Sequence, residues 1–106
     1  MSAYQRRKGA RGENEVCRQL TEALGAKVTR RLGQARDSGE DIRLPPFRIE
    51  VKTLKRIAAL RHLEQAETGA KPGEVPTVVL KEDRGSWAVL MRFEDWIKLA
   101  REEIVG

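Results

Sequence analysis

The sequence predicts an α/β fold in which a mixed β-sheet of about five strands is flanked by helices. Segments of alternating apolar residues, typical of half-buried strands, are interspersed with segments whose apolar residues recur every three or four positions, as on one face of a helix. Their order along the chain is helix, three strands, helix, two strands, helix (α-β-β-β-α-β-β-α). Such an alternation favours helices packed on a single sheet.

The individual elements follow from local patterns and turn residues. Pro45 and Pro46 separate the second and third strands by a tight connection, and residues 81–86 are expected to join the last two strands as a hairpin. Trp87 and Trp96 lie on apolar stripes, which favours core packing over stacking against nucleic-acid bases. Helices are expected over residues 13–24, 56–68 and 93–105, and strands over residues 27–32, 41–44, 47–54, 77–80 and 87–91.

Length and composition predict one soluble domain spanning residues 1–106. Hydrophobic residues make up 40% of the chain and charged residues 35%, as in globular proteins. No apolar run approaches the roughly 18 residues that cross a bilayer, and no apolar signal segment is visible, so we expect no membrane partner and a cytoplasmic location. The single cysteine, Cys17, excludes an internal disulfide and a thiolate metal site; it lies on a helical apolar stripe and is expected in the core.

The positive charge is concentrated near the start of the chain. The net charge is +5, and residues 1–36 contain nine Lys or Arg against three Glu, whereas residues 37–106 contain twelve basic against thirteen acidic residues. Part of the excess lies in residues 1–8, which are expected to form a flexible basic arm. This concentration favours a polyanionic partner, most simply nucleic acid, although a solvated basic surface is the alternative.

Residues 36–55 hold the candidate chemistry. Glu50 and Lys52 alternate with apolar residues and so project from the same face of a strand, and Asp41 begins the preceding strand. If these strands pair, two carboxylates and an ammonium converge, which suits a hard divalent cation with an activated water. The alternatives are that Asp41 closes a turn and that Glu50 and Lys52 form a solvated ion pair. Glu13 lies in a first helical turn, where the helix dipole alone favours an acid.

The order and spacing of these residues resemble a known family. The matching segments are residues 8–15, Arg30 with Arg31, residues 36–42 and residues 49–52; the expected helix at 62–65 and the TrpAlaValLeu strand also fit. They are similar to the PD-(D/E)xK nuclease superfamily, and more narrowly to the small Holliday junction resolvase-like endonucleases of archaea and phages. The resemblance covers most of the chain and implies a restriction-endonuclease-like core. One departure is that Glu40 stands where the family pattern has proline, which is not a ligand in that family.

The resemblance implies a metal-dependent endodeoxyribonuclease that hydrolyses phosphodiester bonds. Asp41 and Glu50 would bind Mg²⁺, or Mn²⁺ as a substitute, together with the backbone carbonyl of Val51. Lys52 would orient or deprotonate the attacking water. Glu13 would hold a metal-bound water or a second ion.

The resemblance also implies branched DNA, such as a four-way junction, as substrate and a homodimer as the active form. Two other functions stay open: a restriction- or phage-type nuclease acting on ordinary duplex or flap DNA, and a non-catalytic basic nucleic-acid-binding module. Gln65 is a further possible site contact. The residues expected to bind DNA phosphates are Arg6, Arg7, Lys8, Arg30, Arg31 and Arg36, with Lys55 and Arg56 as additional candidates.

Overall fold

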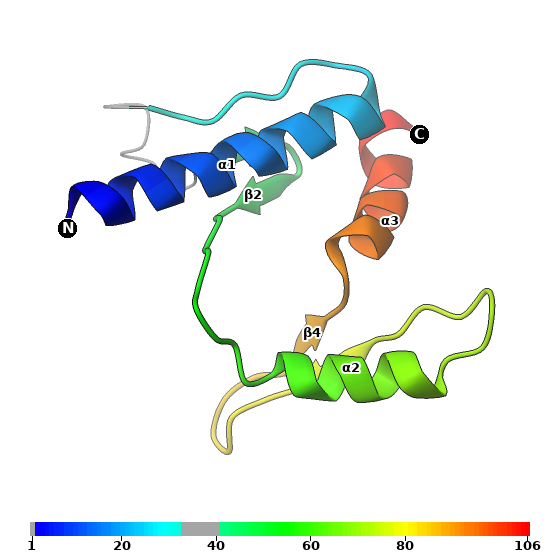
Figure 1. Ribbon diagram of the computed structural model, residues 1–106. Helices are drawn as coiled ribbons and strands as arrows, with labels where there is room; N and C mark the ends of the chain where they lie inside the picture. The colour runs from blue at the N-terminus through cyan, green and yellow to red at the C-terminus, as the bar shows by residue number, and fades with distance from the viewer. Residues whose placement is uncertain (1, 33–40) are drawn as a thin grey trace. The chain divides into compact units, whose positions relative to one another are not determined.

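The computed structural model describes residues 2–32 and 41–106, and within them the chain forms three helices and two separate two-stranded sheets (Figure 1). The chain divides into two compact units: a first unit of Met1–Leu54 with Arg101–Gly106, and a second unit of Lys55–Ala100. The elements are α1 (Ala3–Leu24), β1 (Ile42–Leu44), β2 (Phe47–Ile49), α2 (Leu60–Gly69), β3 (Val78–Leu80), β4 (Ala88–Leu90) and α3 (Phe93–Val105).

Helix α1 begins ten residues earlier than expected, because a capping box fixes its start. The Ser2 side-chain oxygen accepts a hydrogen bond from the Gln5 backbone N–H (3.1 Å), and the Gln5 side-chain oxygen accepts one from the Ser2 N–H (3.0 Å). Residues 3–8, expected as a flexible basic arm, are therefore the first turns of this helix. Helix α1 ends at Leu24, as the sequence predicted. Gly25 follows in the left-handed conformation, and its N–H donates to Thr21 O.

The first sheet is an antiparallel hairpin of β1 and β2 in the first unit. Ile42 pairs with Ile49, Arg43 with Arg48, and Leu44 with Phe47, on either side of the Pro45-Pro46 turn. This confirms a tight connection between the two predicted strands, although both are shorter than expected. Among the described residues of this unit, the buried hydrophobic ones are Cys17, Leu20 and Ile42, so the core lies between α1 and the hairpin, and the core placement of Cys17 is confirmed.

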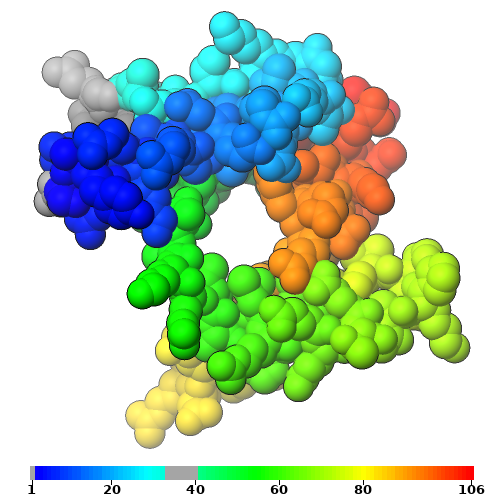
Figure 2. Space-filling view, in the orientation of Figure 1, coloured from blue at the N-terminus to red at the C-terminus, as the bar shows by residue number. Residues whose placement is uncertain are grey.

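Residues 27–32 do not form the expected strand. Arg30 makes one isolated antiparallel bridge to Ile42, and the Arg31 N–H donates to Asp41 O at 2.8 Å. The Val28 N–H donates instead to the Thr21 hydroxyl of α1 at 2.9 Å, so this backbone is tied partly to the helix and not to a continuous ladder. Figure 2 shows the segment (cyan) packed against α1 (blue).

The second unit contains α2 and the antiparallel hairpin of β3 and β4. Val79 pairs with Val89 at the centre of this hairpin, which confirms the predicted connection through residues 81–86. Helix α2 begins at Leu60, four residues later than expected, and Leu63 is fully buried. Arg92 donates to both carboxylate oxygens of Glu67, at 2.8 and 2.9 Å; this hydrogen-bonded pairing lowers the pKa of Glu67.

The prediction of one mixed sheet of about five strands is wrong. Within residues 2–32 and 41–106, each strand is three residues long and pairs only with its neighbour along the chain, apart from the single bridge at Arg30. Alternating apolar residues show which segments are extended, but they do not show which extended segments pair. Local hairpins need only short loops to close, whereas a shared sheet needs pairing between distant segments.

The core placement expected for Trp87 is also wrong. Its side chain is 67% exposed on the same face of the hairpin as Val79 and Val89, and the Lys81 ammonium lies 5.4 Å from the centre of its ring. Trp96 is half-buried and stacks on Phe93, with ring centroids 5.8 Å apart. The alternating pattern therefore identified the strand correctly and misjudged which of its faces is covered.

Helix α1 approaches the chain beyond β2 closely at Gly12. A Cβ atom built on Gly12 would lie 2.5 Å from Thr53 Oγ1 and 3.5 Å from Val51 Cγ1, whereas one built on Gly9 meets no atom within 4 Å. The absence of a side chain at Gly12 therefore lets the helix backbone pack directly on Val51 and Thr53.

Alanine at the two glycines of α1 should have different effects on stability. Gly9→Ala should raise the free energy of unfolding by about 0.5–1 kcal/mol, because alanine loses less backbone entropy in a helix. Gly12→Ala should lose this gain or destabilise the protein, since its Cβ overlaps Thr53 Oγ1. Urea unfolding followed by circular dichroism measures both, and adding Thr53→Ala to Gly12→Ala should restore the gain. Equal stabilisation by the two single variants would contradict the close packing.

Candidate active site

Asp41 is fixed at the open end of the β1–β2 hairpin by hydrogen bonds that its backbone and its side chain make with β2 and the chain beyond it. Its backbone N–H donates to Ile49 O at 2.9 Å, and its carboxylate Oδ2 accepts from the Val51 N–H at 2.7 Å. The residue is only 7% exposed. The paired register ends at Ile42 and Ile49, so Asp41 lies one residue beyond β1, beside the segment that runs from Ile49 to Val51. The expected juxtaposition of Asp41 with the Glu50–Val51 segment is therefore present.

The local sequence explains this position. A short carboxylate directly before a strand can accept a backbone N–H that the ladder would otherwise leave unpaired. Here the Asp41 side chain accepts the N–H of Val51, two residues past Ile49, which is the last paired position of β2. Asp41 is thus a neighbour of the Glu50–Val51 segment. The turn that it was alternatively expected to close begins in residues 37–40, which lie outside the described residues.

Glu50 and Lys52 are both exposed. Val51 and Thr53 contact the helix at Gly12, and successive side chains of an extended segment point in opposite directions. This arrangement keeps Glu50 and Lys52 open to a ligand from solvent while their neighbours hold the segment in place.

Glu13 lies one residue beyond the Gly12 contact, on the buried face of α1. It is 6% exposed, and its Oε1 lies 3.6 Å from Nη1 of Arg30, which is an ion-pair distance. Burial raises the pKa of the Cys17 thiol one turn along the helix; the Glu13 carboxylate raises it further, and Arg30 lowers it. Glu13 therefore belongs to a small buried charge cluster with Arg30 beside the thiol.

The carboxylate oxygens of Asp41 and Glu50 are suitable ligands for a divalent cation. Mg²⁺ takes oxygen ligands and is commonly bound through one or two carboxylates, with waters and substrate phosphates completing its shell. Asp41 and Glu50 would provide two, since Asp41 is hydrogen-bonded to the residues on both sides of Glu50. Nowhere in residues 2–32 or 41–106 do three or more His, Cys, Asp or Glu side chains gather as a group that could hold a metal. Glu13 thus does not join Asp41 and Glu50 in such a group, and the role of the Val51 carbonyl stays a prediction.

The residues expected to bind DNA are distributed over both units. Arg6 and Arg7 are exposed and Lys8 half-buried, on the first turns of α1, while Arg30 and Arg31 are half-buried in the segment beside Asp41. Arg36 lies outside the described residues. Those in the second unit, Lys55 and Arg56, are exposed at its start. Gln65, the possible site contact, is exposed on α2 of the same unit.

Sequence reasoning missed two exposed arginines of the hairpin, Arg43 and Arg48. They occupy directly opposed positions of β1 and β2. The signal was available, since both alternate with apolar residues and so share the outward face of the two strands. Pairing two like charges across a hairpin is the unusual feature that the sequence pattern contained.

No family model matches this sequence, and no curated protein or solved structure matches it significantly. None of the helices in the described parts of the chain is long and apolar enough to cross a membrane.

The reactivity of Cys17 should report the charge cluster around Glu13. Alkylation by iodoacetamide requires the thiolate, so its rate against pH gives the apparent pKa of the thiol. Glu13→Gln should move this profile to lower pH, because it removes a negative charge that raises the pKa, and Arg30→Gln should move it to higher pH. Glu22→Gln, an exposed acid of the same helix, is the control. If the wild type and the three variants had the same dependence of alkylation rate on pH, the charge cluster around Glu13 would be contradicted.

Proposed function

We propose that this protein is a metal-dependent DNA endonuclease that acts on branched DNA. The observation that supports it most directly is the Asp41 carboxylate, which accepts a hydrogen bond from the N–H of Val51, the residue after Glu50, at 2.7 Å. A buried acid fixed beside an exposed one is a suitable pair of ligands for Mg²⁺, or for Mn²⁺ in its place. The exposed Lys52 follows two residues later in the same segment.

In this proposal each residue has a separate task. Asp41 and Glu50 would hold the cation, which when bound polarises the phosphodiester and lowers the pKa of a coordinated water. Lys52 would orient the attacking water and offset negative charge developing on the phosphate oxygens. The water oxygen would form a new bond to phosphorus as one ester P–O bond breaks. The water would release one proton to solvent, and the departing alkoxide would take one proton from solvent, so the step balances. Asp41 needs no movement, because its hydrogen bonds already fix it.

The charge distribution supports a polyanionic substrate. The first unit, which contains Asp41 and Glu50, holds 13 Lys or Arg and 9 Asp or Glu, whereas the second unit holds 8 and 7. Basic residues beside the carboxylates would bind DNA phosphates and offset the repulsion between those acids and the backbone. We further propose a homodimer, which would give paired cuts on opposed strands of a four-way junction, acting in the cytoplasm.

A non-catalytic nucleic-acid-binding module is the second candidate. It is favoured by the ion pair between Glu13 and Arg30, which ties up one of the three expected acids. In that case Asp41 would act only as the residue that closes the hairpin, and Glu50 and Lys52 as solvated surface charges. The two candidates differ in whether a cation is needed for any activity.

Asp41→Asn should reduce metal-dependent nicking about 100-fold or more, because it removes a ligand charge worth several kcal/mol in the transition state. The amide still offers an oxygen to the Val51 N–H, so the hairpin should be retained. Glu50→Gln should also reduce metal-dependent nicking. Glu64→Gln on α2 is the matched control and should leave the nicking rate unchanged. The measurement is cleavage of a labelled four-way junction with Mg²⁺, Mn²⁺ or EDTA. DNA binding without cleavage under any of these conditions would favour the binding module.

Substrate preference is tested by comparing a four-way junction with a linear duplex and a flap of the same sequence. A branched-DNA nuclease should cleave the junction faster, since a two-fold dimer would engage both opposed strands at once. Single-turnover rates at saturating protein separate this preference from affinity. Equal rates on the three substrates would remove the junction assignment and favour a nuclease of ordinary duplex or flap DNA.

A further inference from the structure

The hairpin of β3 and β4 has one covered face and one open face. Helix α2 contacts β3, and the covered face consists of half-buried residues: Val78, Leu80 and Leu90. The opposite face carries Val79 and Val89, which pair at the centre of the hairpin and are 59% and 60% exposed. Trp87, two residues before Val89, is 67% exposed and extends the same face. Three large apolar side chains therefore lie together at the surface.

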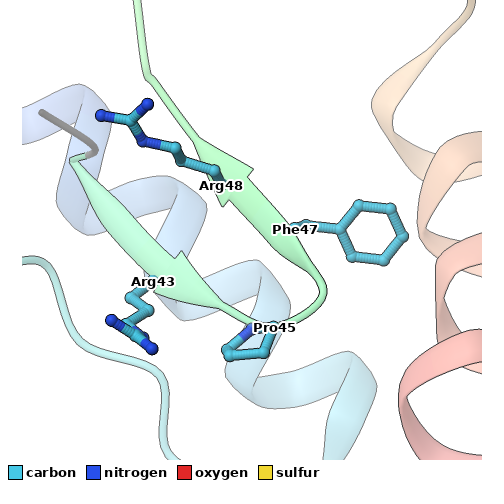
Figure 3. A pocket seen from close by; sticks show the side chains of 4 residues that line it. All are labelled: Arg43, Pro45, Phe47 and Arg48. Atoms are coloured by element: carbon cyan, nitrogen blue, oxygen red, sulfur yellow. The ribbon is translucent and has the colours of Figure 1, made fainter. Parts of the chain in front are cut away.

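The first hairpin shows the ordinary composition of a solvated outer face. Its central outward pair is Arg43 with Arg48, and both are exposed. Figure 3 shows the two side chains pointing apart, beside Pro45 and Phe47. In the second hairpin the central outward pair consists of two valines instead. A contiguous apolar patch of this kind marks an interaction site, because covering it removes an unfavourable contact with water.

The border of this open face is charged but balanced. The turn after β3 carries two bases and two acids, all of them exposed: Lys81, Glu82, Asp83 and Arg84. The Lys81 ammonium lies 5.4 Å from the centre of the Trp87 ring and donates to the Asp83 carbonyl at 3.2 Å. An apolar centre that includes an aromatic side chain, with a polar rim around it, is the usual composition of a protein–protein contact.

The charges favour a second copy of this chain over DNA as the occupant of the open face. Glu82 and Asp83 beside Trp87 would repel the phosphates of a nucleotide stacked on its ring. The second unit as a whole holds 8 basic and 7 acidic residues, so two such units do not repel each other. A two-fold contact joins the same patch of both copies, and an apolar patch is complementary to itself. The mixed charges of one turn can pair with those of the other.

We propose that the open face formed by Val79, Trp87 and Val89 is the contact between two copies of this chain, packed sheet against sheet. This inference rests on the homodimer proposed above and adds the surface through which it forms. Packed sheets lie about 10 Å apart, a space that side chains of this size fill. Stable interfaces bury about 800 Å² per partner, and one aromatic side chain contributes about 150–250 Å². The three side chains therefore form the centre of the contact and the turn its border, and the dimer should dissociate on dilution.

The test is the fluorescence of Trp87 in a Trp96→Phe variant, measured in EDTA and without DNA over a range of protein concentrations. Phenylalanine keeps an aromatic ring beside Phe93, on which Trp96 stacks. As the concentration rises, the emission of Trp87 should move to shorter wavelength and acrylamide should quench it less, because the ring leaves water. Sedimentation equilibrium should show the dimer forming over the same range. Equal shielding of Trp87 at every concentration would mean that the face is covered within one chain, and equal exposure that nothing covers it; either result would overturn the inference.

Substitutions decide whether this face, and not another, makes the contact. Val79→Glu and Val89→Glu should each raise the dissociation constant of the dimer about tenfold or more, because each places a charge in a desolvated centre. Leu99→Glu on α3 is the matched control, since Leu99 is also 59% exposed, and it should leave the constant unchanged. Val79→Thr keeps the side-chain shape and a strand-forming residue. It should weaken the dimer about threefold and leave the urea midpoint near that of the wild type, which separates loss of contact from loss of folding.

The outcomes separate this inference from the nuclease proposal. Wild-type dissociation constants in both glutamate variants, or weakening by Leu99→Glu alone, would overturn the proposed interface and leave metal-dependent nicking unaffected. Quenching of Trp87 by a single-stranded oligonucleotide, with no change in oligomeric state, would replace the second copy by a stacked nucleobase as the occupant. A dimer that both glutamate variants disrupt, without DNA cleavage under any metal condition, would support the inference and refute the nuclease.

Discussion

The hydrogen bond from the Val51 N–H to the Asp41 carboxylate is the interaction on which the candidate site depends. Burying a carboxylate is costly unless hydrogen bonds or charges compensate, and this bond is a charge-assisted one. It also satisfies a backbone N–H where the paired strands end. One contact thus stabilises the hairpin end, fixes the Asp41 side chain, and sets it against the Glu50–Val51 peptide.

The position of α1 depends on a second local feature, the missing side chain at Gly12. Because the helix backbone reaches Val51 and Thr53 there, the next residue, Glu13, enters the buried face of the first unit. A buried carboxylate needs a counter-charge, and Arg30 lies within ion-pair distance. Arg30 is in turn held by its bridge to Ile42. Helix, hairpin and connecting segment are therefore linked through charged groups as well as through the core.

Local sequence features predicted much of this structure, and the failures have physical causes. The Pro45-Pro46 turn, the second hairpin and the end of α1 at Gly25 follow from residues with restricted or unusual backbone preferences. The start of α1 could also have been predicted from the sequence, since Ser2 and Gln5 form a capping box. The basic composition of residues 1–8 suggested a flexible arm instead. Exposure of Trp87 and the separation of the two hairpins depend on which surfaces meet, and apolar alternation does not encode that.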